Sequence, residues 1–170
     1  FIETHFDERT LKAFKKCKVP AMQADLFRYC ALFSEGGIYV DADTKNSGKL
    51  LELLTERTHG LLMTREERIA NDFMYVQDAE DQLFKETIIK AVANIENEIS
   101  NNVWMVTGPG IMTHMNQDNF CSHLFRKFDF EPARVVREFV LFYHNLEYKA
   151  SVEDWRQYSS DKSSSIFKCV

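Results

Sequence analysis

Two carboxylates, separated by one small residue, end a short apolar run in the first third of the chain. The run is Ile38–Val40 and the carboxylates are Asp41 and Asp43. In an extended backbone, residues i and i+2 point the same way, so both side chains can face one point beyond the strand. Convergent carboxylates suit Mg²⁺ or Mn²⁺, which commonly bridges protein oxygens and substrate phosphates. The spacing fits a divalent-cation site and fits a solvated turn equally well.

The surroundings of the two carboxylates favour the first interpretation. Asp78 with Glu80, and Asp129 with Glu131, have the same spacing, but they lie in charged stretches that are typical of solvated segments. Asp41 instead follows a run that would be buried in a sheet. Ligands of open α/β sheets bind at the carboxyl ends of such strands.

A helix is predicted just before this strand. The apolar residues between positions 24 and 33 have helical spacing, and Gly36 is a natural stop signal after them. Asp25 and Arg28 are three positions apart and therefore share a helix face. They could form an exposed ion pair, which would contribute a few tenths of a kcal/mol. They could also serve a ligand site next to Asp41.

The order of these residues resembles a known family. Asp25, Arg28, a pair of glycines, Tyr39 and the Asp41/Asp43 pair follow one another within about twenty residues. This pattern is similar to the glycosyltransferases with a DXD-containing sugar-binding region. These are enzymes of the family 32 type from bacteria and fungi, and they are related to the clostridial glucosylating toxins. Weaker similarities at positions 69–73 and 107–111 extend the resemblance from about residue 20 to 115.

The resemblance implies a fold and an activity. It implies an α/β, GT-A-like nucleotide-diphospho-sugar transferase fold that lacks its N-terminal strands, since only about 35 residues precede the Asp41 strand. The activity would be metal-dependent, retaining transfer of a sugar from a nucleotide-diphosphate sugar to a saccharide, lipid or protein acceptor. Polysaccharide biosynthesis is one setting for it. The catalytic domain would span residues 1–158, followed by a polar C-terminal tail at 159–170.

The resemblance also implies a role for individual residues. Asp41 and Asp43 would be catalytic, with Asp43 the direct ligand of Mn²⁺ or Mg²⁺ and Asp41 its partner. His144 is a further candidate ligand, although a lone histidine is more often structural. The donor sugar would be bound by Asp25, Arg28, Tyr39 and Asn71. Lining of the site would come from Gly36, Gly37, Thr107, Gly108 and Pro109.

Two other functions stay open. A haloacid dehalogenase-like phosphohydrolase would use Asp41 as nucleophile and Asp43 as acid/base, but Lys45 stands where that family has Thr or Val. The chain could also be a catalytically incomplete binding fragment. A calcium loop of the EF-hand kind is excluded because Lys45 occupies a position that needs an oxygen ligand.

Composition limits the class of protein. The chain has 170 residues, which predicts one domain. A net charge of -5 and dispersed basic residues argue against a nucleic-acid surface. The four cysteines form no CxxC motif and are typical of reduced thiols in a cytoplasmic protein. No apolar run is long enough to span a membrane. A homo-oligomer or a partner chain is expected to cover the open sheet edge left by the missing strands.

Periodicity predicts the remaining elements. Helices are expected at 8–16, 22–34, 48–54, 81–99 and 111–125, and strands at 37–41, 60–64, 73–76, 103–106 and 135–143. The strand at 37–41 is expected inside a mainly parallel sheet, with the two carboxylates emerging at its carboxyl end.

Overall fold

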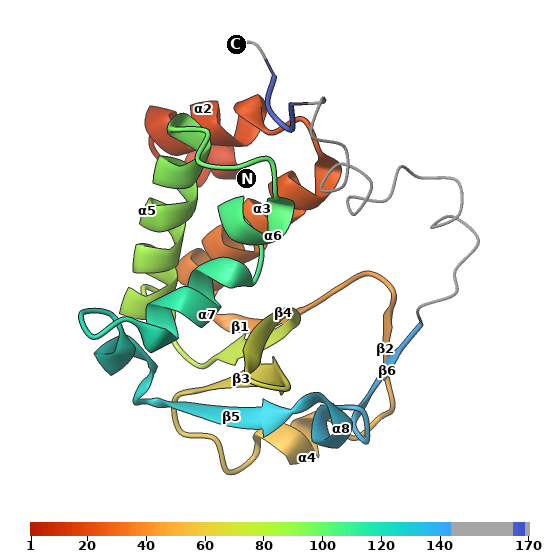
Figure 1. Ribbon diagram of the computed structural model, residues 1–170. Helices are drawn as coiled ribbons and strands as arrows, with labels where there is room; N and C mark the ends of the chain where they lie inside the picture. The colour runs from red at the N-terminus through yellow and green to blue at the C-terminus, as the bar shows by residue number, and fades with distance from the viewer. Residues whose placement is uncertain (144–164, 169–170) are drawn as a thin grey trace.

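The computed structural model describes residues 1–143 and 165–168 and has a mixed α/β architecture (Figure 1). Its helices are α1 Ile2–His5, α2 Glu8–Lys16, α3 Pro20–Glu35, α4 Leu50–Leu54, α5 Gln82–Glu96, α6 Val103–Val106, α7 Gly110–Gln117, the 3₁₀ turn η1 Ser122–Phe125 and α8 Ala133–Val136. Its strands are β1 Gly37–Val40, β2 Thr44–Asn46, β3 Gly60–Arg65, β4 Arg68–Val76, β5 Phe128–Pro132 and β6 Val140–Phe142. The predicted α/β class is confirmed.

The main sheet has four strands in the order β1-β4-β3-β5. β4 pairs antiparallel with both β1 and β3, and only β3 and β5 run parallel. β2 and β6 form a separate antiparallel pair beyond the end of β1. The strand that leads into Asp41 therefore lies at an edge of the described sheet, beside its longest strand.

The prediction of an interior strand in a mainly parallel sheet is wrong. Parallel neighbours need a long crossover between them, whereas two residues, Glu66 and Glu67, join β3 to β4. Glu66 adopts a φ of 57°, as tight hairpin turns require. This hairpin supplies the central strand β4 and forces antiparallel pairing on either side of it.

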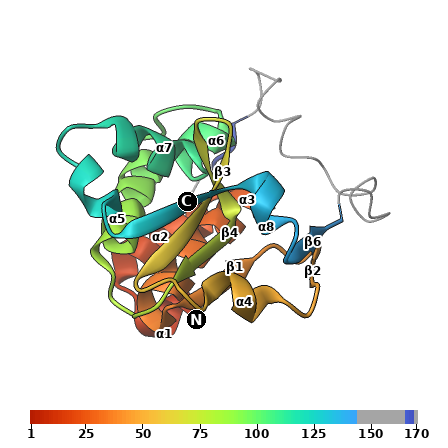
Figure 2. The ribbon, with the colours of Figure 1, turned by 90° about the horizontal axis from the view of Figure 1, so that it is seen from below.

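The sheet lies between two unequal layers. In Figure 1 the long helices α2, α3 and α5, with α6 and α7, lie on one side of the sheet and the short helices α4 and α8 on the other. Figure 2, seen from below, shows β5, β3, β4 and β1 crossing in front of the long helices. The larger core packs under the long helices, around Tyr29, Met74 and Phe84, while a smaller one lies around Leu53, Phe73 and Val136. No helix in the described part of the chain is long and apolar enough to cross a membrane.

Three predicted elements differ from the structure. Residues 103–106 form the helical turn α6 instead of a strand, because Asn102 caps it by accepting a hydrogen bond from the Trp104 backbone N–H at 3.0 Å. The expected helix at 111–125 divides into α7 and η1. The expected strand at 135–143 begins as α8 and is extended only from Val140 to Phe142. At α6, local capping outweighs apolar periodicity.

Strand β5 was missed because its alternating acidic residues looked like a solvated stretch. Asp129 and Glu131 lie on this edge strand and both pair with Arg57, Asp129 at 3.1 Å. These two acidic residues therefore hold the strand in place through Arg57, which agrees with leaving them out of the candidate site.

The last described residues pack onto the body of the domain. Ile166 is fully buried and Phe167 is 6% exposed, and Phe167 forms an isolated bridge with Cys17. Positions 159–164 and 169–170 of the predicted tail, and the boundary at 158, lie outside the described residues.

The two glycines before β1 shape the turn from α3 into the sheet. The Gly36 N–H donates to the Leu32 carbonyl at 2.9 Å and ends the helix. Gly36 has φ 65° and ψ -155°, a conformation that is essentially restricted to glycine. A Cβ added there would lie 3.0 Å from the backbone of Gln77 and Asp78, whereas one added at Gly37 would meet nothing within 4 Å.

We therefore expect Gly36→Ala to be more destabilising than Gly37→Ala. Both substitutions strain a positive φ, at a cost of about 1 to 2 kcal/mol, but only Gly36→Ala also pushes against a neighbouring backbone. Urea unfolding of the two variants measures the difference. Equal losses in the free energy of unfolding would contradict this account of the turn.

Candidate functional site

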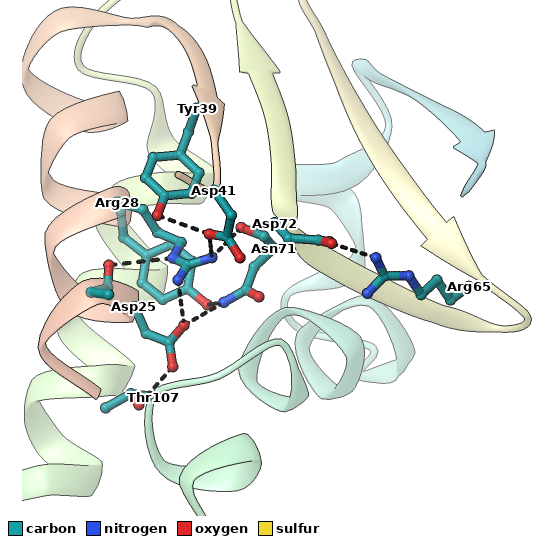
Figure 3. Close-up of polar contacts among 10 residues, drawn as sticks. Asp25, Arg28, Tyr39, Asp41, Arg65, Asn71, Asp72 and Thr107 are labelled. Carbon is teal, nitrogen blue, oxygen red and sulfur yellow. Dashed lines mark hydrogen bonds and ion pairs between the residues drawn. The ribbon is translucent and has the colours of Figure 1, made fainter. Parts of the chain in front are cut away.

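Helix α3 and strand β1 bring three of the predicted residues into direct contact (Figure 3). An Arg28 Nη1 atom lies 3.0 Å from Asp41 Oδ1, and Nη2 lies 3.2 Å from Asp25 Oδ1. The side chains of Asp25 and Arg28 are only 8% and 7% exposed. The pair is therefore buried and faces the carboxylate at the end of β1, so the interpretation as an exposed ion pair is wrong.

Backbone and aromatic contacts fix the Arg28 guanidinium further. Its Nη1 donates to the carbonyl of Asn71 at 2.7 Å, and its Nε donates to the carbonyl of Ala24 at 3.3 Å. The guanidinium carbon also lies 4.6 Å from the centre of the Tyr39 ring, a favourable cation–π distance. Arg28 thus ties α3 to β1 and β4.

Asp25 accepts hydrogen bonds from two distant segments. The Asn71 amide on β4 donates to its Oδ1 at 2.9 Å, and the Thr107 hydroxyl after α6 donates to its Oδ2 at 3.1 Å. The same Asn71 amide also donates to the Tyr29 hydroxyl at 3.0 Å. Sequence reasoning treated Tyr29 as a core residue, although its position one helical turn after Asp25 was a signal that the two share a face.

Burial and charge act against each other at these groups. Burial raises the pKa of Asp25, and the Arg28 guanidinium together with Asn71 and Thr107 opposes that rise. Burial acts to lower the pKa of Arg28, but the carboxylates of Asp25 and Asp41 outweigh it, so the pKa is raised. Arg28 is therefore a permanent positive charge beside Asp41.

Asp41 is held from two sides. Besides its contact with Arg28, its Oδ1 accepts a hydrogen bond from the Tyr39 hydroxyl at 3.0 Å. Burial raises the pKa of Asp41, Arg28 and Tyr39 oppose the rise, and the charges of Asp72 and Asp43 add to it. Repulsion among these carboxylates is the kind of strain that a bound cation relieves.

Removal of the Tyr39 hydroxyl should raise the pKa of Asp41 further, because that hydrogen bond stabilises the ionised carboxylate. The loss of stability in Tyr39→Phe, about 1 kcal/mol or less, is expected in full only above the pKa of folded Asp41. It should fade as the pH falls through the pKa of folded Asp41, which lies above the ordinary value of 3.8, because the protonated carboxyl gains nothing from this hydrogen bond. Carboxyl ¹³C titration measures the pKa of Asp41, and melting curves at several pH values measure the loss of stability. A loss of stability in Tyr39→Phe that grows on acidification would contradict a hydrogen bond from Tyr39 to ionised Asp41.

Asp43 lies two residues on, half-buried, where the chain turns into β2. Its carbonyl accepts a hydrogen bond from the Tyr143 N–H at 2.8 Å, so β6 fixes this turn. In the described part of the chain, no three His, Cys, Asp or Glu side chains form a ready metal cage. Mg²⁺ and Mn²⁺ are often held by one or two carboxylates together with substrate phosphates, so Asp41 and Asp43 fit such an ion.

Two buried polar atoms next to these aspartates support a ligand site. Thr44 Oγ1 and Asp72 Oδ1 are the buried side-chain oxygen or nitrogen atoms without a hydrogen-bond partner among the described residues. Thr44 follows Asp43 directly, and the Asp72 carbonyl accepts a hydrogen bond from the Asp41 N–H at 3.1 Å. Unsatisfied buried atoms are rare in folded proteins and often mark the place of a water or an ion.

The structure does not bring the remaining predicted residues to this network. Gly36 and Gly37 lie at the opposite end of β1 from Asp41 and shape the turn after α3. Gly108 allows a close approach to Trp104, whose backbone would lie 2.9 Å from an added Cβ, and Pro109 precedes α7. His144 lies outside the described residues.

Comparison with known families agrees with this geometry. Residues 1–59 match the family model described as "Glycosyltransferase sugar-binding region containing DXD motif". Over this stretch, about a third of the chain, the sequence is similar to the sugar-binding region of DXD-containing glycosyltransferases. The match confirms the resemblance seen in the motifs and contains Asp25, Arg28, Tyr39, Asp41 and Asp43. Asn71 and Thr107 lie beyond it, yet they complete the same hydrogen-bond network.

Other comparisons add less. The search of curated proteins gave no significant match. Among solved structures, the chain is similar to "PaToxG Glycosyltransferase" with 22% sequence identity and a TM-score of 0.46, over 64% of this chain. The match spans 41% of the length of that protein.

Proposed function

We propose that this chain is a metal-dependent, retaining glycosyltransferase that moves a sugar from a nucleotide-diphosphate sugar to a saccharide, lipid or protein acceptor. The observation that supports this most is the 3.0 Å contact between Arg28 and Asp41, which couples the buried Asp25–Arg28 pair to the DXD carboxylates. A surface ion pair and a solvated turn would have no reason to meet in this way.

Asp25 and Arg28 retain the capacity to bind a sugar hydroxyl. A carboxylate has about four acceptor positions, and three of those of Asp25 are used by Arg28, Asn71 and Thr107. A guanidinium has five N–H donors, and four of those of Arg28 are used by Ala24, Asn71 and the carboxylates of Asp25 and Asp41. One acceptor and one donor remain, which matches a hydroxyl that both donates and accepts. A substrate lacking that hydroxyl would leave buried groups unpaired, at a cost of about 1 to 3 kcal/mol.

The carboxylates would serve the other half of the donor. Asp43 and Asp41 would hold Mn²⁺ or Mg²⁺, an ion that, when bound, stabilises negative charge on a departing diphosphate. Arg28 and Tyr39 fix the orientation of Asp41 through its Oδ1 atom. In this proposal the acceptor attacks from the face that the diphosphate leaves, so the configuration of the sugar is retained.

The phosphohydrolase alternative fits the geometry less well. It uses Asp41 as a nucleophile but gives no role to the buried Asp25–Arg28 pair, whose guanidinium contacts Asp41 Oδ1. These contacts are typical of a carboxylate that binds and orients. Sugar transfer gives Asp25 and Arg28 a role in binding the donor, whereas phosphate-ester hydrolysis gives them none.

A screen of nucleotide sugars for donor hydrolysis tests the proposal. We expect at least one donor to be cleaved to sugar and nucleoside diphosphate when Mn²⁺ is present, and cleavage to stop when EDTA is added. Retention of configuration can be read from the NMR spectrum of the released sugar. Absence of cleavage with every donor would contradict the proposal, and Mg²⁺-dependent release of phosphate from a phosphomonoester would favour the alternative.

A further inference from the structure

Asp72 on β4 is a third carboxylate beside the DXD segment. It directly precedes Phe73, which pairs with Val40 at the end of the β1–β4 ladder, and its carbonyl accepts a hydrogen bond from the Asp41 N–H at 3.1 Å. Its negative charge acts on Asp41 together with that of Asp43. The antiparallel register therefore places Asp72 next to the candidate cation site, although it is 31 positions from Asp41 in the sequence.

The two oxygens of Asp72 have different environments. Oδ2 is bound by the guanidinium of Arg65, which reaches it from the end of β3 (Figure 3). Oδ1 is buried and has no partner among the described residues. An ion pair with Arg65 explains one oxygen only. Burying a carboxylate oxygen without a partner is unfavourable, so the other oxygen needs a ligand to explain its position.

We propose that Asp72 is a positioning residue of the donor site, whose Oδ1 accepts a hydrogen bond from the hydration shell of the divalent cation held at Asp41 and Asp43. Arg65 holds Oδ2 and so fixes the direction of the free oxygen. This inference rests on the proposed function. Mg²⁺ and Mn²⁺ usually keep several waters in protein sites, and the groups that bind those waters change metal affinity by about 10- to 100-fold.

The test compares Asp72→Ala with Arg65→Ala. Both variants remove the ion pair, but only the first removes the Oδ1 acceptor. Mn²⁺ affinity is measured from the electron paramagnetic resonance signal of free Mn²⁺, alone and with UDP or GDP. We expect Asp72→Ala to weaken Mn²⁺ binding at least tenfold, Asp72→Asn to weaken it less because it keeps an oxygen acceptor, and Arg65→Ala to change it by less than about threefold.

A matched control is Asp129→Ala, which removes another Asp–Arg pair of the same sheet, with Arg57. It should leave Mn²⁺ affinity unchanged. If Asp72→Ala does not fold, as judged by its melting curve, the isosteric Asp72→Asn decides the matter. Equal effects of Asp72→Ala and Arg65→Ala, or unchanged affinity in both Asp72 variants, would overturn the inference. A wild-type chain that binds neither Mn²⁺ nor the nucleotides would overturn the proposed function itself.

Discussion

Asp43→Asn is expected to abolish Mn²⁺-dependent binding of a nucleoside diphosphate, with a loss of at least 100-fold in affinity. The substitution keeps the size of the side chain and removes the charge that a hard cation needs. Asp43 lies at the half-buried turn between β1 and β2, where its backbone carbonyl is held by Tyr143. The fold should survive, because Asp43 is only half-buried and its main-chain contact with Tyr143 is kept. Isothermal titration with UDP or GDP, with and without Mn²⁺, measures the effect.

The matched control for this experiment is Asp78→Asn. Asp78 has the same i, i+2 acidic spacing, with Glu80, but lies in the exposed turn after β4. Its substitution should leave nucleotide affinity within about twofold of the wild type. If Asp43→Asn binds the nucleotide with Mn²⁺ as well as the wild type does, the assignment of Asp43 as metal ligand is wrong.

Asp25→Ala is expected to reduce both stability and activity. It leaves the buried Arg28 without one of its carboxylates, and it leaves Asn71 and Thr107 without their acceptor. Breaking a buried ion pair in this way costs about 3 to 5 kcal/mol, and in a domain of this size each kcal/mol lowers the melting temperature by about 2 to 4 °C. We expect a fall of about 10 °C, and at least a tenfold loss of turnover below the new melting temperature.

Glu96→Ala provides the comparison, since Glu96 pairs with Arg9 on the surface, where both side chains are well exposed. Such a pair contributes less than about 1 kcal/mol. Melting curves of the two variants, recorded side by side, separate the two kinds of ion pair. An Asp25→Ala variant that melts and turns over like Glu96→Ala would show that the Asp25–Arg28 pair does not support the site.

The part of the site that could be predicted from the sequence is the part that is local in the chain. Asp25 and Arg28 share a face of one helix, and Asp41 and Asp43 follow one strand, so spacing predicted each pair and the family resemblance joined the two pairs into one site. Arg28 then meets Asp41 because Gly36 reverses the chain between them. Thr107 was predicted as lining, but its hydrogen bond to Asp25 depends on packing across 82 positions of sequence.

The role of Asp72 was missed because it depends on the pairing of β1 with β4. Sequence reasoning expected a mainly parallel sheet, in which the residue opposite Asp41 would have been a different one. The two-residue hairpin at Glu66 and Glu67 carries no Gly or Asn signal for a tight turn, so the antiparallel register could not be recognised. The residues of the site near position 40 could therefore be predicted from helix and strand periodicity. The position of Asp72 depends on tertiary strand pairing and could not.

The most direct test of the central claim is a crystal structure of this chain with Mn²⁺ and the nucleoside diphosphate that it binds, with the metal located by its anomalous scattering. The account predicts one strong Mn²⁺ peak in contact with Asp43, close to Asp41 and to the terminal phosphate, and absent in crystals of Asp43→Asn. A peak elsewhere in the molecule, or a diphosphate bound away from the end of β1, would contradict it.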